Sequence, residues 1–176
     1  MLLGGPLACL DAAYTSRLVV AACVLFEGWG DGLPTRELVR FLPAPAPYQS
    51  GALYRRELPA LLEVLRALEE EPVLLLVDAY VWLDERGRPG LGAHLWAALE
   101  SRRPVVGVAK RPFRGAPAVA VWRGRSRRPL FVTAAGVDPR WAAERVAAMH
   151  GAFRIPTLLA TVDRLSRQAL LRAGRP

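Results

Sequence analysis

The chain has 176 residues, of which 52% are hydrophobic, and it carries a net charge of +8. This length and composition predict a single domain (residues 1–176) with a sizeable packed core, and they exclude a disordered chain. No apolar run approaches the length of a membrane span, and the first residues lack the positive region of a signal peptide. Two cysteines give no disulfide framework, which is typical of a reducing compartment. We therefore expect a cytoplasmic protein without a membrane partner.

The positive charge is concentrated in one stretch of the sequence. No acidic residue lies between Glu100 and Asp138. The basic residues in this interval are Arg102, Arg103, Lys110, Arg111, Arg114, Arg123, Arg125, Arg127 and Arg128. A segregated basic stretch favours a face that follows the phosphates of a nucleic acid. Because arginine far outnumbers lysine along the whole chain, an arginine-rich solvated surface is the alternative interpretation.

The first part of the chain predicts three strands. Alternating and apolar runs place them at about residues 7–13, 17–27 and 36–41. The glycine cluster at 28–32 is typical of a hairpin turn. The prolines that alternate through residues 42–47 exclude both a regular helix and a central strand, so we expect a semi-rigid loop there.

Helices and strands alternate in the rest of the chain. Leucines recur at helical spacing between residues 53 and 70 and predict a helix, and the short apolar run 73–77 is typical of a central parallel strand. Further along, the pattern predicts a glycine-rich turn at 87–90, a helix at 91–101, strands at 105–109, 118–122 and 130–133, and helices at 139–150 and 157–173. This order predicts an α/β protein with a ribonuclease H-like fold. We expect a central mixed sheet, three antiparallel strands followed by parallel strands, flanked by helices.

Four carboxylates stand out in the predicted elements, three of them where an apolar run ends or a helix begins. Asp11 and Asp78 each close an apolar run, Glu57 opens a helix, and Asp163 lies inside one. The predicted fold brings the ends of the first and fourth strands together at the centre of the sheet. A carboxylate at the end of a buried strand is costly unless it is paired or holds a cation. Since Mg²⁺ prefers oxygen ligands, the four acids indicate a magnesium site of the kind used to cut phosphodiesters. Their spacing alone would suit many enzymes.

Seven short segments, spread nearly end to end, are more specific than the carboxylates alone. They are Leu10-Asp11-Ala12-Ala13-Tyr14, residues 47–57, Leu75-Leu76-Val77-Asp78, Gly90-Leu91-Gly92-Ala93-His94-Leu95, Val106-Gly107-Val108-Ala109-Lys110, Pro129-Leu130-Phe131-Val132-Thr133, and residues 153–165. In this order and spacing the chain resembles the endonuclease V family, repair nucleases that recognise deaminated adenine.

The resemblance implies a role for each acid and for one lysine. Asp11 and Asp78 would bind the catalytic Mg²⁺, for which Mn²⁺ can substitute, and Glu57 and Asp163 would complete the metal site. Lys110 would stand near the scissile phosphate and offset developing charge. Taken singly, Glu57 also fits a first-turn acid favoured by the helix dipole, and Lys110 fits a surface residue at a strand end.

The resemblance also implies residues that handle the damaged base. Tyr48 matches the aromatic of the family's wedge, a loop that holds the strands apart at the lesion, and could stack on a base. The lesion would turn out of the helix into a pocket. The pocket positions carried over are Gly51, Leu53, Ala79, Gly90 and Leu91. His94, on the following helix, is expected to be structural rather than catalytic.

Departures from the family pattern gather around base recognition. The wedge lacks its second proline and reads Pro47-Tyr48-Gln49-Ser50-Gly51. Ala79 replaces the family's glycine, and residues 80–86 replace a segment rich in Gly and His. The family's Ser-Pro-Gly-His segment, which follows a late strand, is replaced here by Thr133-Ala134-Ala135-Gly136. Since every proposed metal ligand is present, we expect cleavage to be retained and lesion preference to be altered.

The sequence therefore predicts a magnesium-dependent endonuclease that cuts near a deaminated purine (inosine) in DNA and acts in DNA repair. The expected partner is DNA with deaminated or distorted bases, and a monomer is the expected state. Two alternatives stay open: a non-cleaving nucleic-acid-binding module on the same fold, and a nuclease for inosine RNA or for flap and mismatch structures. The choice between DNA and RNA depends on contacts to the 2′-hydroxyl, which the sequence leaves open.

Overall fold

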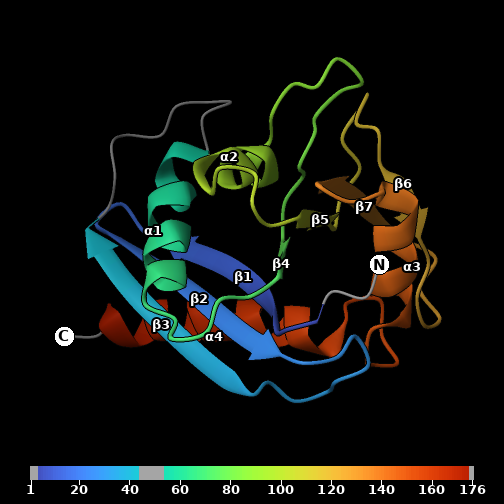
Figure 1. Ribbon diagram of the computed structural model, residues 1–176. Coiled ribbons are helices and arrows are strands. Elements are labelled where there is room, and N and C mark those ends of the chain that lie inside the picture. The colour runs from blue at the N-terminus through green and yellow to red at the C-terminus, as the bar shows by residue number, and fades with distance from the viewer. Residues whose placement is uncertain (1–3, 44–53, 175–176) are drawn as a thin grey trace.

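The computed structural model describes residues 4–43 and 54–174, and its centre is a seven-stranded sheet in the order β3-β2-β1-β4-β5-β7-β6 (Figure 1). The strands are β1 (Leu7–Tyr14), β2 (Leu18–Phe26), β3 (Arg36–Pro43), β4 (Leu74–Val77), β5 (Val105–Ala109), β6 (Val119–Val121) and β7 (Leu130–Ala135). The helices are α1 (Tyr54–Arg66), α2 (Leu91–Ala98), α3 (Pro139–Ala148) and α4 (Thr157–Ala173). The ribonuclease H-like α/β fold predicted from the sequence is confirmed.

Helices cover both faces of the sheet because both faces of its central strands are apolar. Side chains alternate along a strand, so Cys9 of β1 packs with α3 and α4, whereas Ala8 and Leu10 pack with α1 and α2. Cys9 and Cys23 are both buried free thiols, as predicted, and they belong to the two opposite cores. Within the described part of the chain, no helix is long and apolar enough to cross a membrane.

Strand direction decides where the functional side chains meet. β1 pairs with β4, and β4 pairs with β5, in parallel, and Leu10 lies opposite Val77. These three strands therefore end at the same edge of the sheet, which we call the carboxyl edge. β2 and β3 pair antiparallel, joined by the predicted glycine turn, in which the Asp31 carboxylate accepts the backbone N–H of Gly28 at 2.8 Å.

One of the last two strands, β7, runs against the expected parallel series. β7 is antiparallel to both β5 and β6. The connection between β6 and β7, residues 122–129, contains no helix, and a connection this short joins antiparallel neighbours rather than making a parallel crossover. Because β5 and β6 are both antiparallel to β7, they point the same way, and β6 also ends at the carboxyl edge.

Helix α1 ends earlier than its leucine pattern predicted, at Arg66 instead of Glu70. Three consecutive acids, residues 69–71, follow it and precede Pro72. Negative charges at a helix carboxyl end oppose the helix dipole and repel one another, which explains the early end. Helix α2 likewise ends at Ala98, three residues before the predicted boundary.

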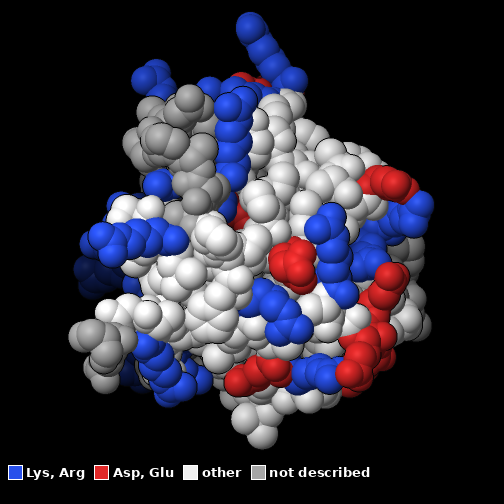
Figure 2. All heavy atoms as spheres, turned by 90° about the vertical axis from the view of Figure 1, so that its left-hand side faces the viewer, with Lys and Arg blue, Asp and Glu red and all other residues white. Residues whose placement is uncertain are grey.

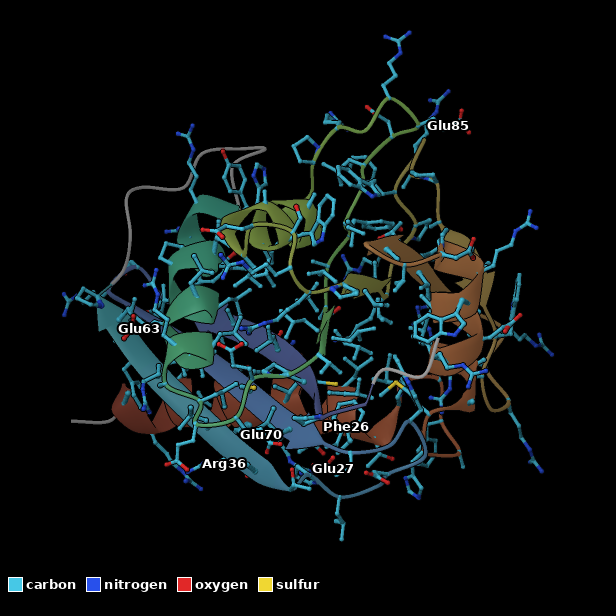
Figure 3. The ribbon with its side chains drawn as sticks, in the orientation of Figure 1. Phe26, Glu27, Arg36, Glu63, Glu70 and Glu85 are labelled. Carbon is cyan, nitrogen blue, oxygen red and sulfur yellow. The ribbon has the colours of Figure 1, made fainter. Side chains whose placement is uncertain are left out.

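The basic stretch 102–128 is divided between opposite edges of the sheet, because β5 runs through it. Arg103 precedes β5 and pairs with Glu71 at 2.5 Å, and Arg102 pairs with Glu100. The prediction of one phosphate-following face is therefore wrong for these two arginines. The opposite edge also holds acids: Glu70 and Glu27 lie there in Figure 3. On the face shown in Figure 2, Lys and Arg are spread widely while acids gather toward the lower right.

Candidate active site

Three carboxylates converge at the carboxyl edge. Asp11 lies in β1 one residue beyond its pairing with β4, Asp78 directly follows β4, and Asp163 projects from α4. One oxygen from each carboxylate lies within 4.8 Å of the other two. All three residues are partly buried. Like charges this close repel one another, and hard oxygen donors of this kind suit Mg²⁺, so the donor set fits a divalent cation.

Ser166 orients one of these carboxylates and was missed in the sequence. Its side chain is fully buried, and its hydroxyl contacts the Asp11 carboxylate and lies 3.0 Å from the carbonyl oxygen of Asp163. Ser166 stands four residues after Val162, on the apolar face that α4 turns toward the sheet. A small polar residue on an otherwise apolar helix face was the signal that could have found it.

Glu57 lies near the three acids. It does not belong to the group whose carboxylate oxygens lie within 4.8 Å of one another. It stands in the first turn of α1 and lines the same pocket as Asp78. Burial, followed by repulsion from Asp11 and Asp78, raises the pKa of Glu57 to about 8. Glu57 is therefore largely protonated at neutral pH unless a cation joins the cluster.

Asp11 is also shifted toward the protonated form. Burial raises its pKa to about 6, the Ser166 hydroxyl works in the opposite direction, and the charges of Asp78 and Asp163 add to the rise. A bound cation would reverse these effects, because it favours the ionised carboxylate.

Lys110 supplies positive charge at the same place. It follows β5, and its ammonium contacts the Asp78 carboxylate and lies 3.5 Å from the Asp163 carboxylate. Burial lowers the pKa of Lys110, but the hydrogen bond and the charge of Asp78, with those of Asp163 and Asp11, raise it more, so the net shift is upward. The lysine therefore stays charged where a phosphate would approach the acids.

The backbone around Lys110 is held from two sides by residues that sequence reasoning did not assign. The Arg154 guanidinium donates to the Lys110 carbonyl and, at 2.9 Å, to the Pro129 carbonyl. On the other side, the Tyr80 hydroxyl donates to the Arg111 carbonyl at 2.8 Å and accepts the Phe113 N–H at 3.0 Å. Tyr80 is two residues from Asp78, so it joins the loop after β4 to the loop after β5.

A pocket of about 480 Å³ opens beside the acids and Lys110. Three of the pocket positions carried over from the family, Ala79, Gly90 and Leu91, line it. The other three substrate-binding predictions, Tyr48, Gly51 and Leu53, lie outside the described residues. The remaining lining residues are Tyr54, Glu57, Asp78, Tyr80, Leu83, Pro89, Ala109, Lys110, Arg111 and Phe113.

Close backbone packing shapes this pocket. A Cβ added at Gly90 would lie 2.4 Å from the Tyr80 carbonyl oxygen, and one added at Gly107 would lie 2.4 Å from that of Ala79. The buried Thr133 hydroxyl accepts the Val81 N–H at 2.8 Å. The loop after Asp78 is thus pressed against neighbouring backbone, which leaves no room for a side chain at either glycine.

His94 contributes to the pocket rim through packing. Its ring stacks on Tyr54, with centroids 3.6 Å apart and planes 13° apart. Tyr54 begins α1, the helix that carries Glu57. This contact is consistent with the structural role predicted for His94, and burial lowers its pKa.

The acid cluster predicts how stability depends on pH and on divalent cations. The folded pKa of Glu57, about 8, lies above its ordinary 4.5, and that of Asp11, about 6, lies above 3.8. The stability that these two groups contribute is therefore full at low pH and is lost as the pH rises from about 4 to 8. In EDTA, we expect the Tm to drop by about 5 °C or more between pH 5 and pH 8.5. Because Mg²⁺ favours ionised carboxylates, it should raise the Tm more at pH 8.5 than at pH 5.

Differential scanning fluorimetry at both pH values, with EDTA or with MgCl₂, measures this effect. Glu57→Gln should flatten the dependence in EDTA, because the shifted carboxyl is removed. A Tm in EDTA that changes equally with pH in the wild type and in Glu57→Gln would contradict the assignment of the shift to this cluster.

The fold and site define a class of protein: a ribonuclease H-like sheet with a carboxylate cluster and a lysine at the ends of its central strands is a metal-dependent nuclease. Comparison with known proteins makes the class specific. The family model described as Endonuclease V matches residues 5–138. The chain therefore belongs to the endonuclease V family, whose members hydrolyse phosphodiester bonds.

Individual relatives agree with this assignment. Endonuclease V of Thermus thermophilus is 34% identical over 189 residues, covering 96% of this chain and 81% of that protein. That of Rhodospirillum centenum is 34% identical over 167 residues, covering 80% of this chain and 66% of that protein. The crystal structure of Streptomyces avermitilis endonuclease V superposes with a TM-score of 0.79 at 28% identity, covering 97% of this chain and 83% of that one. Endonuclease V of Ciona intestinalis shares the fold with a TM-score of 0.82 at 20% identity, covering 97% of this chain and 87% of that one.

Proposed function

We propose that this protein is a single-domain, cytoplasmic, magnesium-dependent endonuclease that cuts DNA near a deaminated purine, above all inosine, and acts in DNA repair. The observation that carries the proposal is the convergence of Asp11, Asp78 and Asp163 with Lys110 beside a pocket of about 480 Å³. That volume lies within the range of small-ligand sites, about 300–1,000 Å³, and suits one nucleobase turned out of its helix.

The residues divide the chemistry between them. Asp11, Asp78 and Asp163 would hold Mg²⁺, or Mn²⁺ in its place, and Ser166 keeps the Asp11 carboxylate oriented. A bound ion of this kind makes water a stronger nucleophile and stabilises charge on the phosphate oxygens. Glu57, whose carboxyl shares its pocket with Asp78, would complete the acidic site once a cation favours its ionised form.

Lys110 would bind the phosphate that is cut. Its ammonium lies against Asp78 and Asp163, so a phosphate placed beside these acids would also lie within reach of the lysine. Fixed positive charge at this point stabilises the charge that develops in the transition state. The hydrogen bonds from Arg154 and Tyr80 hold the carbonyl of Lys110 and the backbone that directly follows it.

Substrate choice would depend on the pocket and on the wedge. Ala79, Gly90 and Leu91 bring backbone and small side chains to the pocket wall, where a flat base can approach. Tyr48, Gly51 and Leu53 are proposed to complete the grip on the lesion. The Ciona protein was crystallised with DNA containing an inosine followed by a ribo-adenosine, which supports inosine as the lesion to test first.

A cleavage panel tests the proposed function. The substrates are duplex DNA with deoxyinosine, uracil or a mismatch, inosine-containing RNA, flapped DNA, and undamaged DNA. We expect deoxyinosine DNA to be cut at least about 10-fold faster than undamaged DNA in Mg²⁺, and no cutting in EDTA. If every substrate is bound but none is cut, the protein is a non-cleaving module. If only RNA or flaps are cut, the proposed substrate is wrong.

A further inference from the structure

The active site has a basic and aromatic neighbour at the same edge of the sheet. We propose that residues 122–129 and 151–154 form a platform that binds a single-stranded stretch of nucleic acid flanking the cleavage site. This inference rests on the proposed nuclease function and adds the part of the substrate that lies beyond the base pocket.

The direction of β6 places the platform beside the active site. Ala109 of β5 and Ala120 of β6 both lie opposite Phe131 of β7, so the two strands end at nearly the same level. Trp122 therefore follows β6 at the height at which Arg111 follows β5. β6 lies three strands from β4, about 14 Å at 4.8 Å per strand. In Figure 1, β6 and β7 lie with α3 on the right-hand side of the sheet.

Two large aromatic rings are exposed on this platform. Trp122 is 63% exposed and Phe153 is 80% exposed. Large aromatic rings are mostly buried in folded proteins. Two exposed rings on neighbouring segments therefore indicate an interaction surface. Since the face of an aromatic ring stacks on the face of any nucleobase, the pair suits a sequence-independent contact.

The two segments are fixed to each other, so the rings have a stable base. The buried Arg123 guanidinium donates to the Phe153 carbonyl at 3.0 Å and to the Arg154 carbonyl at 3.3 Å. Gly124 adopts a φ of +58°, and a Cβ there would lie 2.2 Å from the Ala152 carbonyl oxygen. Glycine is required at this close approach, and it brings the backbone after Trp122 directly against the backbone before Phe153.

The charge of the platform suits phosphates. Arg125, Arg127 and Arg128 are exposed, and in the part of the chain that the structure describes no carboxylate lies within ion-pair distance of them. This differs from Arg102 and Arg103 at the opposite edge, which are paired with acids. Arginines without an acidic partner keep their full charge available for a polyanion.

A continuous set of contacts joins the platform to the active site. Lys110 touches the acids, Arg154 touches the Lys110 and Pro129 carbonyls, and Arg128 directly precedes Pro129. A nucleic-acid strand that leaves the reacting phosphate at Lys110 can therefore follow positively charged side chains to Trp122. Lys110 follows β5, which lies two strands from β6, about 10 Å at 4.8 Å per strand, so this path spans a few nucleotides of single strand. The occupant is single-stranded, because a base within a duplex does not present its face to a protein ring.

Binding of oligothymidylates of 4, 8 and 16 nucleotides tests the platform, measured by fluorescence anisotropy in EDTA with the full-length protein. Trp122→Ala and Phe153→Ala should each weaken binding of the 16-mer about 10-fold, and the double variant more. Leu33→Ala is the matched control, because Leu33 is 82% exposed but lies between β2 and β3 at the opposite edge. Arg128→Ala should lower the slope of log affinity against log salt by about 0.7, whereas Arg102→Ala should not.

Each outcome bears on the proposal separately from the nuclease function. Double-variant binding of the 16-mer within twofold of wild type, at an unchanged Tm, overturns the platform even if deoxyinosine DNA is still cut. If the double variant loses as much affinity for a blunt duplex as for the 16-mer, the single-strand assignment is overturned. Loss of 16-mer binding by the double variant supports the platform even if the cleavage panel finds no nuclease activity.

Discussion

Replacing Asp78 by asparagine is expected to lower kcat for deoxyinosine DNA in Mg²⁺ by about 1,000-fold or more. Asp78 contributes an oxygen to the group of three carboxylates and contacts Lys110, so the change removes a charge from both interactions while keeping the shape of the side chain. Losing several kcal/mol of transition-state stabilisation corresponds to this factor, since each 1.4 kcal/mol changes a rate 10-fold. Single-turnover cleavage at saturating protein measures the chemical step directly.

A matched control for this substitution lies in the same loop. Asp84 accepts the backbone N–H groups of Arg86 and Arg88, both at 3.0 Å, and an asparagine oxygen can accept the same bonds. Asp84→Asn should therefore cleave at the wild-type rate. The folding of Asp78→Asn should be intact, because one of three mutually repelling charges is removed, and its Tm should no longer rise with Mg²⁺ at pH 8.5. Wild-type cleavage by Asp78→Asn would refute the proposed active site.

Local pattern was sufficient to predict the part of the site that is built by parallel strands. Asp11 and Asp78 each end an apolar run, and parallel neighbours end at a common edge, so the two were expected to meet. The side chain that completes the group is different. Asp163 lies in the middle of a helix, and nothing local says which strand that helix crosses, so its place came from the family resemblance.

Side chains that act across several elements could not be found from the pattern. Tyr80 reaches Arg111 and Phe113, 31 and 33 residues away, and Arg154 reaches Lys110, 44 residues away. Each is one polar residue in an irregular loop, where neither helical nor strand periodicity indicates a partner. Such contacts depend on how β5, β7 and α4 are arranged in space.

The basic stretch shows how strand direction changes an interpretation based on charge alone. Residues 102 and 128 belong to one run without acids, yet Arg102 precedes β5 at one edge and Arg128 precedes β7 at the other. A strand of five residues separates its two ends by about 16 Å. Only the part of the run at the carboxyl edge can therefore act together with Lys110 and the acids.

Arg123→Ala is expected to lower the free energy of unfolding by about 3–5 kcal/mol, the largest stability effect that we predict. Arg123 is 6% exposed, and its guanidinium lies within hydrogen-bond distance of six carbonyl oxygens, those of Ala147, Met149, His150, Gly151, Phe153 and Arg154. The first two belong to the carboxyl end of α3, where a positive charge also complements the helix dipole. Alanine would leave these carbonyls without a donor in a space too confined for full hydration.

Thermal and urea unfolding measure the effect, which for a chain of this size corresponds to a Tm lower by about 8–15 °C. Arg123→Lys should recover part of the loss, because an ammonium has three donors whereas the guanidinium has five. Arg125→Ala, at an exposed position two residues away, is the matched control and should stay within about 0.5 kcal/mol of wild type. Equal stability of Arg123→Ala and Arg125→Ala would show that the carbonyls find other partners.

The same substitution should reach the active site through the backbone. Arg123 holds the carbonyl of Arg154, and Arg154 in turn holds the carbonyl of Lys110. At a temperature where Arg123→Ala is still folded, we therefore expect kcat for deoxyinosine DNA to fall about 10- to 100-fold, as when an outer support of a catalytic group is lost. Arg123→Lys should recover part of the rate and part of the stability together, because both effects begin with the same carbonyls. A variant that is destabilised by several kcal/mol but cleaves at the wild-type rate would mean that Arg154 and Lys110 keep their positions without Arg123.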